Sequence, residues 1–527
     1  MGAAGSFQCS AEVNSACAKV FAPGENTCTA HKRRPTVWGP MSYWHLYCFH
    51  HAKIDKQRQM PVDFLSFFIV FLQFIIAPLL SFMYNSTNIF TRLVKVLGVM
   101  NLKLLVKGGH VVDPSSGLDQ ICDVLVDSGR IAAVGESLPT PEDNCSVLDA
   151  SGLVVAPGLV DLHVHLREPG FEDKETIATG CAAAARGGVT TLVAMPNTRP
   201  ATDCPEMVAQ VKEKAARTGI TVYPAAAVTQ GQKGEALTDF HALWEAGVPA
   251  LTDDGVPVQN LALLRQAMQQ ARTLGMPILD HCEDRDMVRN YAVNEGAVSR
   301  QLGIPGRPAI AEELQVMRDV MLSKDTGARV HICHISTAGT VDIIRKAKAD
   351  GVAVTCETCP QYFTLTEEEI LRQGTMARVN PPLRTEADRA AILEGLKDGT
   401  IDAIVTDHAP HCAWEKAQPL EKAPSGMVGL ETSLGLALTY LYHAGHMSLM
   451  EVINRMSTAP ASLLRLPKGS LQVGRHADLV LFDPDQVWTV NKEDFASKGR
   501  NTPFHGFQLK GKVKYTISMG QIIYQED

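Results

Sequence analysis

The sequence predicts an α/β protein whose larger part is a (β/α)8 barrel, joined to a small β-sandwich domain. Three observations predict this fold. Eight short apolar runs follow one another over about 300 residues, helical stretches that end in glycine separate them, and strand-like segments stand at both ends of the same region. A doubly wound open sheet also alternates strands and helices, and it is the alternative fold.

Glycine marks the start of most of the predicted barrel strands. Glycine readily adopts the left-handed conformation that ends a helix, and continuous apolar runs suit strands that are buried on both faces. Seven such runs follow Gly188, Gly219, Gly247, Gly275, Gly327, Gly351 and Gly399. With "GLVDLHVHL" (158–166) as the first strand, the count is eight, and residues 157–467 are predicted to form the barrel.

The two flanking segments read as short strands joined by tight turns. "LKLLVKGGHVVDP" and "DVLVDSGRIAAVGES" lie in residues 100–156, with a turn predicted at Asp127-Ser128-Gly129. "ADLVLFDPD" and "KVKYTISMGQIIYQ" lie in residues 468–527, with a fold-back predicted at Met519-Gly520. We expect these two ends to pair into one small β domain that is split across the sequence.

Residues 1–99 differ from the rest in composition. They hold ten of the seventeen phenylalanines, and an apolar run at 63–84 has the length of a membrane span. Basic residues flank this run on both sides and give it no orientation. The favoured interpretation is a mis-assigned start, with Met100 as the true initiator, because a strand pattern begins directly after it; a membrane segment is the alternative.

Composition and charge narrow the class of protein. A hydrophobic fraction of 45% and a charged fraction of 20% are ordinary for a globular protein, and the net charge of −8 provides no footprint for nucleic acid. The thirteen cysteines show no disulfide framework. Cys356 and Cys359 form a CxxC pair, which we interpret as reduced thiols of a cytoplasmic protein.

Polar side chains stand at the carboxyl ends of the predicted barrel strands. In a barrel these ends converge on the face where the active site forms. His163 and His165 are two apart in one strand, so their side chains project to the same face. The other strand ends carry Asn197, the pair Asp253 and Asp254, His281, His334 and Asp407.

Imidazole and carboxylate ligands without an essential thiolate suit zinc or another borderline divalent ion. One zinc ion needs only three protein ligands and a water, so six candidate ligands indicate a pair of metal ions. Adjacent strand residues point to opposite faces, so only one of Asp253 and Asp254 faces inward. The spacing does not decide which one.

The motifs resemble those of the class I, bacterial-type dihydroorotases of the amidohydrolase superfamily. The similarity runs in one register from about Met100 to the end of the chain, and residues 1–99 lie outside it. Seven motifs occur in the family's order: "VDLHVHLREPG", "AMPNT", "TDDGVPVQ", "DHCED", "HICHIST", "RVNPPLR" and "VTDHAPH". One departure is Gln361-Tyr362, where many relatives carry a histidine that is not a ligand.

The resemblance implies a zinc centre with two ions in each subunit, and it implies that Asp254 rather than Asp253 is the bridging ligand. The implied ligands are His163, His165 and Asp407 for the first ion, and His281 and His334 for the second. It also implies substrate contacts from the side chains of Arg167, Asn197, Asn380 and His411 and from the backbone of Ser425 and Gly426.

The implied activity is the reversible conversion of N-carbamoyl-L-aspartate into L-dihydroorotate in pyrimidine biosynthesis. Asp407 would act as general base and then general acid, and the planar fork of Arg167 suits the carboxylate of the substrate. The charged stretch 411–429 is expected to be a mobile loop at the mouth of the site. Expected partners are the small-molecule substrate, with a homodimer or an association with aspartate transcarbamoylase as options.

Two other functions compete with this interpretation. Hydantoinases, dihydropyrimidinases and allantoinases resemble the same barrel, but they usually bridge their metals with a carbamylated lysine and lack the arginine of "HLREPG". An inactive barrel that serves as a structural partner is the second rival. The complete set of six ligands argues against an inactive copy.

Overall fold

The computed structural model describes residues 103–142 and 144–526. The predictions for residues 1–99, including the apolar run at 63–84, fall outside the described residues. Among the helices of the described part, none has the length and apolar character needed to cross a membrane.

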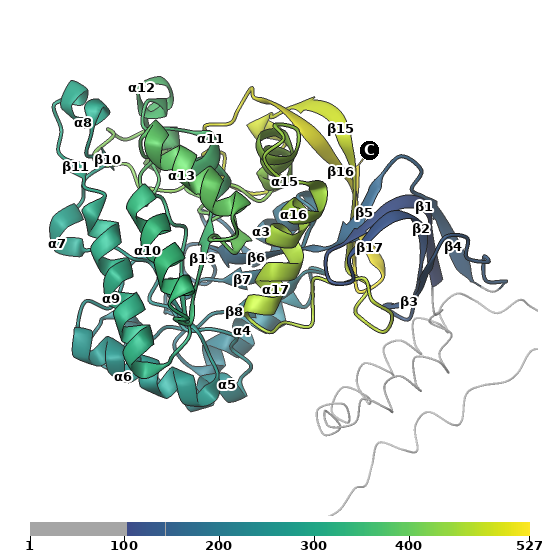
Figure 1. The fold of residues 1–527 in the computed structure, drawn as a ribbon, viewed down its shortest axis with the longest axis horizontal. Coiled ribbons are helices and arrows are strands. Elements are labelled where there is room, and N and C mark those ends of the chain that lie inside the picture. The colour runs from purple at the N-terminus through teal and green to yellow at the C-terminus, as the bar shows by residue number, and fades with distance from the viewer. Residues whose placement is uncertain (1–102, 143, 527) are drawn as a thin grey trace, which may run out of the picture. The chain divides into compact units, whose positions relative to one another are not determined.

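Strands from both ends of the described region lie in one eight-stranded sheet (Figure 1). Its order is β17-β16-β15-β5-β1-β2-β3, and β4 pairs with β1. Antiparallel pairing of β15 with β5, from Leu479 opposite Pro157 to Phe482 opposite Val154, joins the two ends. The strands are β1 (Lys103–Asp113), β2 (Leu118–Asp127), β3 (Arg130–Gly135), β4 (Cys145–Asp149), β5 (Val154–Pro157), β15 (Leu479–Thr489), β16 (Gln508–Ser518) and β17 (Gln521–Gln525).

Both predicted turns of this sheet are confirmed. Ser128 and Gly129 have φ of 53° and 76°, and Met519 and Gly520 have φ of 49° and 78°. Two successive residues with positive φ are typical of two-residue hairpins, whose twist matches that of the strands. Gly108-Gly109 lies inside β1, where the register with β2 shifts between Val106 and Gly109.

The apolar runs of the middle region form short parallel strands. One set pairs in the order β6-β7-β8 and the other in the order β14-β13-β12-β9. Parallel bridges from Ala226 to Leu251, from Leu251 to Ile278 and from Val164 to His408 connect the sets. The strands are β6 (Leu159–Val164), β7 (Val189–Ala194), β8 (Thr221–Pro224), β9 (Ile278–Asp280), β12 (Val330–Ile332), β13 (Val354–Thr358) and β14 (Ala403–Ile404).

The predicted strand after Gly247 is reduced to a bridge at Leu251. Backbone bonds are present there, since Leu251 N donates to Pro277 O and Thr252 N donates to Ala226 O. Pro249 has no N–H to extend the ladder toward the amino end, and the chain turns away after Asp253 and Asp254. The run therefore occupies its place between β8 and β9 without being a full strand.

Helices follow the parallel strands, and Figure 1 shows α6, α9, α10 and α13 grouped on the side away from β1–β4. All seven glycines predicted to precede strands have positive φ, between 67° and 83°. The longer helices are α3 (Ile177–Arg186), α4 (Pro205–Ala215), α6 (Leu261–Leu274), α9 (Ile310–Thr326), α10 (Ala338–Ala349) and α13 (Glu386–Lys397).

Short elements complete the described chain. The short α-helices are α5 (Phe240–Glu245), α7 (Arg285–Val288), α8 (Ala297–Leu302), α11 (Pro360–Thr364), α12 (Glu369–Gln373), α14 (Ala413–Lys416), α15 (Ser433–Ala437), α16 (Leu449–Ile453) and α17 (Ala459–Leu463). The remaining ones are β10 (Val293–Asn294), β11 (Gly306–Arg307), and the 3-10 or π turns η1 (Gln230–Gln232), η2 (Gly374–Ala377), η3 (Leu438–Tyr442), η4 (Asn454–Thr458) and η5 (Lys492–Asp494).

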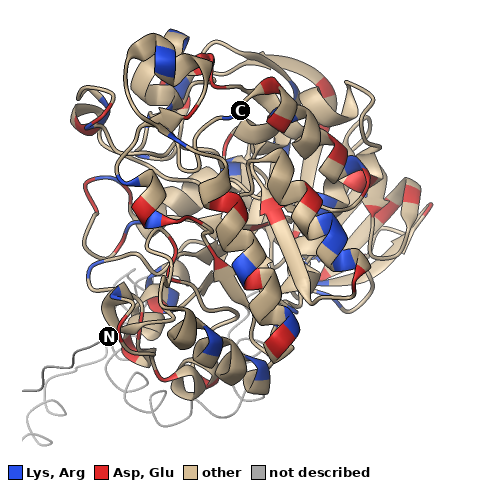
Figure 2. Ribbon diagram, turned by 60° about the vertical axis from the view of Figure 1, so that its left-hand side comes forward, with Lys and Arg blue, Asp and Glu red and all other residues tan. Residues whose placement is uncertain are grey.

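Two apolar cores stabilise these parts. Every residue of β6 and β7 is buried, as expected for parallel strands covered on both faces. A separate cluster, which includes Val106, Val124 and Leu481, packs within the eight-stranded sheet. On the face shown in Figure 2, basic and acidic residues are interspersed along the helices.

Candidate metal centre and active site

One cavity of about 190 Å³ brings together all the predicted site residues except His163, which is fully buried behind it. Its walls come from the carboxyl ends of the parallel strands and from the segments that follow them. The lining residues are His165, Arg167, Asn197, Asp254, Gly255, His281, His334, Asn380, Asp407, Ala409, His411, Ser425 and Gly426.

The two histidines at the end of β6 face the same carboxylates, as the spacing predicts. His163 Nε2 lies 3.4 Å from Asp254 Oδ1 and 3.8 Å from Asp407 Oδ1. His165 Nε2 lies 3.1 Å from Asp407 Oδ1 and 3.6 Å from Asp254 Oδ2. Together with Asp254, the two histidines form a group that could hold a metal ion.

The second pair of histidines approaches Asp254 from β9 and β12. His281 Nδ1 lies 3.6 Å and His334 Nε2 lies 3.7 Å from Asp254 Oδ1, and the two ring nitrogens are 3.1 Å apart. Asp254, His281 and His334 form another group that could hold a metal ion. Asp254 is thus common to both groups.

The structure separates the two adjacent aspartates. Asp253 turns to Thr229, accepting hydrogen bonds from its backbone N–H (3.1 Å) and from its hydroxyl. Burial raises the pKa of Asp253 to about 6. Burial would also raise the pKa of Asp254, but the neighbouring histidines, His163 above all, hold it well below its usual value. Only Asp254 therefore faces the histidines.

The polar atoms of this cluster fit a metal centre. His163 Nε2 and Asp254 Oδ1 are buried and have no hydrogen-bond partner among the described residues, which is costly unless another group satisfies them. Two atoms that each bind one zinc ion at tetrahedral angles lie about 3.4 Å apart. The separations of 3.1–3.8 Å between Asp254 or Asp407 oxygens and the histidine nitrogens are close to this value.

Three predicted site residues have a strained backbone. Arg167, His334 and Asp407 have φ of 63°, 33° and 48°. Positive φ is uncommon for residues other than glycine and tends to occur where surrounding structure imposes it for function. At each of these positions the chain leaves a strand and directs a polar side chain into the same cavity.

Glu357, at the end of β13, is a site residue that the sequence analysis missed. Both Glu357 and His163 are fully buried, and His163 Nδ1 donates to Glu357 Oε1 (3.0 Å), while Nε2 points toward Asp254. His331 Nε2 lies 3.1 Å from Glu357 Oε2. Burial would raise the pKa of Glu357, but the bonds from His163 and His331 lower it to about 2. The sequence feature that could have identified Glu357 is its position as a carboxylate at the carboxyl end of a predicted barrel strand.

Arg167 reaches the cavity from the turn after β6. Its Nε donates to Pro410 O (3.2 Å), and its Nη2 lies 3.4 Å from His411 Nε2. Glu168, the neighbour that could have paired with it, instead accepts from Lys214 Nζ (2.5 Å) and Ile177 N (2.9 Å). Among the described residues no carboxylate forms an ion pair with Arg167, so its charge is available to a ligand.

The two predicted asparagines contact the metal-site histidines. Asn197 Oδ1 accepts from His165 Nδ1 (2.9 Å), and its Nδ2 donates to Asp254 Oδ2 (3.3 Å). Asn380 Nδ2 lies 3.1 Å from His281 Nε2, and its Oδ1 accepts from Arg307. Arg307 was also missed, because nothing in its sequence surroundings indicates a site. Both asparagines line the cavity and contact histidines that are candidate metal ligands.

His411, Ser425 and Gly426 form another part of the cavity wall. His411 Nε2 donates to Ser425 O (2.8 Å), and burial next to Arg167 lowers the pKa of His411 to about 2. Gly426 has φ of 134°, and an added Cβ would lie 2.8 Å from Ala409 Cβ, so this position requires glycine. The N–H of Gly426 donates to Arg378 O (2.9 Å).

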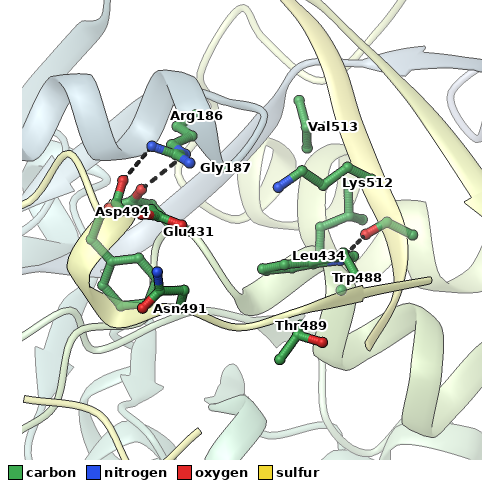
Figure 3. A pocket seen from close by; sticks show the side chains of 13 residues that line it. Arg186, Gly187, Glu431, Leu434, Trp488, Thr489, Asn491, Asp494, Lys512 and Val513 are labelled. Atoms are coloured by element: carbon green, nitrogen blue, oxygen red, sulfur yellow. Dashed lines mark hydrogen bonds and ion pairs between the residues drawn. The ribbon is translucent and has the colours of Figure 1, made fainter. Parts of the chain in front are cut away.

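Neither the CxxC pair nor a second cavity belongs to the lining of this site. Cys356 and Cys359 are buried and free, and burial raises their pKa values. A cavity of about 60 Å³ between α3, α15, β15 and β16 contains none of the predicted site residues (Figure 3). Its cations have partners within the protein: Arg186 lies 3.4 Å from Glu431, and Lys512 lies 4.2 Å above the ring of Trp488.

Comparisons with known proteins agree with the motifs. A family model described as "Dihydro-orotase-like" matches residues 152–340. "Dihydroorotase" from Pelotomaculum thermopropionicum is 49% identical over 425 residues, which cover 81% of this chain and 99% of the relative. "Dihydroorotase" from Syntrophus aciditrophicus is 46% identical over 427 residues, which cover 81% of this chain and all of the relative.

Solved structures of related hydrolases are similar in fold. The L-hydantoinase (dihydropyrimidinase) from Arthrobacter aurescens has a TM-score of 0.73 and 27% identity, covering 81% of this chain and 96% of that one. The dihydropyrimidinase from Brevibacillus agri has a TM-score of 0.71 and 26% identity, covering 80% and 95%. The relatives with nearly half of their residues identical confirm the resemblance seen in the motifs. This chain belongs to the dihydroorotase family.

Proposed function

We propose that the chain catalyses the reversible, zinc-dependent conversion of N-carbamoyl-L-aspartate into L-dihydroorotate, a step of pyrimidine biosynthesis. One observation carries the choice of substrate. The guanidinium of Arg167 has no carboxylate partner among the described residues, and it lines the same cavity as the cluster of histidines and aspartates. A substrate that carries a carboxylate beside a cyclic amide matches this arrangement.

We assign the metal ligands from the distances within the cluster. His163, His165 and Asp407 would hold one zinc ion, His281 and His334 the other, and Asp254 would bridge them. Bound ions would act as Lewis acids toward the ring carbonyl and would lower the pKa of the attacking water. Glu357 supports this assignment, because its bond to Nδ1 keeps Nε2 of His163 free to bind a metal ion.

Asp407 is the proposed acid-base residue. In ring opening, the water oxygen bonds to the carbonyl carbon, the ring C–N bond breaks, and Asp407 moves the proton of the water to the departing nitrogen. Burial would raise the pKa of Asp407, but the close contact with His165 and the charges of the nearby histidines lower it. Asp407 is therefore ionised and ready to accept a proton at neutral pH.

The remaining wall would orient the substrate. Arg167 would bind its carboxylate with the planar guanidinium, and Asn197, Asn380, His411 and the backbone of Ser425 and Gly426 would contact the rest of the molecule. Asn197 already contacts His165 and Asp254, two of the proposed metal ligands. A substrate carboxylate that binds Asn197 would therefore couple the position of the substrate to the orientation of these two side chains.

The closed order of parallel pairings supports a (β/α)8 barrel for residues 157–467. The pairings run from β6 through β7, β8, Leu251, β9, β12, β13 and β14 and return to β6 through His408. The eight-stranded sheet and its own apolar cluster support a composite β domain of residues 100–156 and 468–527, for which we propose a sandwich. A cytoplasmic location, and a homodimer or an association with aspartate transcarbamoylase, remain predictions.

A cyclic amide without a carboxylate, such as dihydrouracil or hydantoin, is the competing substrate, because the similar solved structures include hydantoinases and dihydropyrimidinases. The test is a turnover assay of the zinc-loaded enzyme with L-dihydroorotate, dihydrouracil, hydantoin and allantoin. We expect turnover of L-dihydroorotate alone. Comparable rates on dihydrouracil would contradict the proposal.

A further inference from the structure

Lys416, at the end of α14, is a buried lysine in a stretch whose charge predicts exposure to solvent. Only 2% of the residue is exposed. Its ammonium donates to three backbone carbonyls: Pro424 O and Gly426 O at 3.0 Å, and Arg378 O at 3.3 Å. Lysine is seldom buried to this degree unless it is paired with an acidic group.

No acidic group among the described residues lies close enough to Lys416 to form an ion pair. The adjacent Glu415 directs its carboxylate to Cys412 N (3.0 Å) and Lys174 Nζ (2.8 Å). Burial accordingly lowers the pKa of Lys416 to about 7. Burying an ammonium without an acidic partner lowers the stability of the fold, and the hydrogen bonds to the three carbonyls offset this loss.

The three carbonyls belong to the wall of the proposed substrate site or to residues close to it in the chain, since Gly426, Ser425 and Asn380 line the cavity. Pro424 and Gly426 flank Ser425, and Arg378 lies two residues before Asn380. The carbonyl of Arg378 also accepts from Gly426 N (2.9 Å), so Lys416 and Gly426 meet at one acceptor. A single ammonium therefore links α14, the 424–426 segment and the 378–380 segment.

We propose that Lys416 is a positioning residue that fixes the Ser425–Gly426 wall of the cavity in the shape that binds substrate. Lys416 does not line the cavity and would not touch the substrate. The inference rests on the proposed function, since it assigns Ser425 and Gly426 to substrate binding. A lysine suits the task because three N–H groups diverge from one atom, whereas the donors of arginine lie in one plane.

Replacement by methionine tests the role without removing the bulk of the side chain. In Lys416→Met, Gly426 O keeps the bond from Asn501 Nδ2 (3.0 Å) and Arg378 O keeps the bond from Gly426 N, so the fold should survive. Lys422→Met is the matched control, because Lys422 lies in the same stretch and is exposed.

The experiment compares both variants with the wild type in zinc content, steady-state kinetics with L-dihydroorotate, and amide hydrogen exchange. For Lys416→Met we expect unchanged zinc content and a KM raised at least about tenfold, with a smaller change in kcat; this is the scale for the loss of one charged hydrogen bond. We also expect faster amide exchange that is confined to residues 420–428. Lys422→Met should match the wild type in all three measurements.

Two results would overturn the inference. One is wild-type KM and wild-type exchange at residues 420–428 in Lys416→Met. The other is loss of zinc together with faster exchange throughout β6–β14, which would show a general structural role. If the methionine variant does not fold, the same measurements are made on Lys416→Arg. If wild-type protein fails to turn over L-dihydroorotate, the proposed function fails, while exchange at residues 420–428 still tests the link made by Lys416.

Discussion

The two faces of β9 carry two buried clusters of polar groups that differ in one respect. On one side, His281 meets His334 and Asp254, and Asp254 Oδ1 lacks a hydrogen bond among the described residues. On the other side, Asp280 and Cys282 meet Asp319, and this group too has the spacing of metal ligands. There, however, Arg318 donates to Asp280 Oδ2 and Asp319 Oδ1, both at 2.7 Å.

The difference shows what separates a metal site from a structural network. Both clusters are buried and both contain carboxylates, so composition and burial do not distinguish them. In the Arg318 cluster the protein supplies the cation itself, and each of the two aspartates accepts a hydrogen bond from it. In the His281 cluster Asp254 Oδ1 faces only histidines and has no hydrogen bond among the described residues, so a metal ion would complete the cluster.

The largest expected effect comes from breaking the cluster of histidines and aspartates, which Asp407 joins through His163 and His165. Asp407→Asn removes the proposed proton carrier and one ligand, so kcat should fall by at least about 10²–10⁴-fold. His411→Ala, which removes a predicted substrate contact only, should reduce activity less. Steady-state kinetics at matched zinc content make the comparison, and near-normal turnover by Asp407→Asn would place the site elsewhere.

Breaking the cluster that contains its own cation should affect stability and leave metal binding unchanged. Arg318→Met leaves the buried pair Asp280 and Asp319 without its cationic partner and should lower the free energy of unfolding by about 3–5 kcal/mol. The control Arg265→Met removes a half-exposed pair with Asp325 and should cost less than about 1 kcal/mol. Denaturant unfolding and zinc analysis measure both effects; loss of zinc in Arg318→Met would show that the two clusters are not independent.

Arg167 extends the comparison to a cation without a partner. Arg167→Met should weaken binding of L-dihydroorotate by about 2–4 kcal/mol, the scale for leaving a charged partner unpaired. Zinc content should not change, because Arg167 is not a ligand. Inhibition by a non-reacting carboxylate analogue measures the affinity, and equal affinity in the variant and the wild type would remove the reason for choosing this substrate.

The smallest effect is expected from removing residues 1–99. All proposed site residues and the first strand of the sheet lie after Met100, so a chain that begins at Met100 should have wild-type kcat, KM and zinc content. Sequencing the mature protein by mass spectrometry adds a second observation. Peptides from between Arg58 and Arg92 in a membrane fraction would contradict the expected cytoplasmic location.

The strand ends and their polar residues could be predicted from the sequence because both depend on local pattern. Glycine before an apolar run indicates where each strand begins, and parallel strands bring their carboxyl ends to one face. Residues as distant in sequence as His163 and Asp407 could therefore be assigned to one site before any contact was known.

The partners of these residues could not be predicted in the same way. The alternation of side chains left Asp253 and Asp254 equivalent. The family resemblance favoured Asp254, and in the structure the bonds from Thr229 hold Asp253 away from the histidines. Lys416 lies in a charged stretch that is typical of an exposed loop, yet its ammonium donates to carbonyls of other segments. Such contacts depend on how distant segments pack, which a single sequence does not express.

The most direct test is the number of zinc ions bound by the metal-free protein after equilibrium with zinc in buffer without bicarbonate. The wild type and Asp253→Ala should bind two ions per chain, or nearly so, whereas Asp254→Ala should lose zinc, because only Asp254 contacts both pairs of histidines. Full zinc binding by Asp254→Ala would contradict the metal centre described here. Wild-type protein that binds zinc only after bicarbonate is added would contradict it as well.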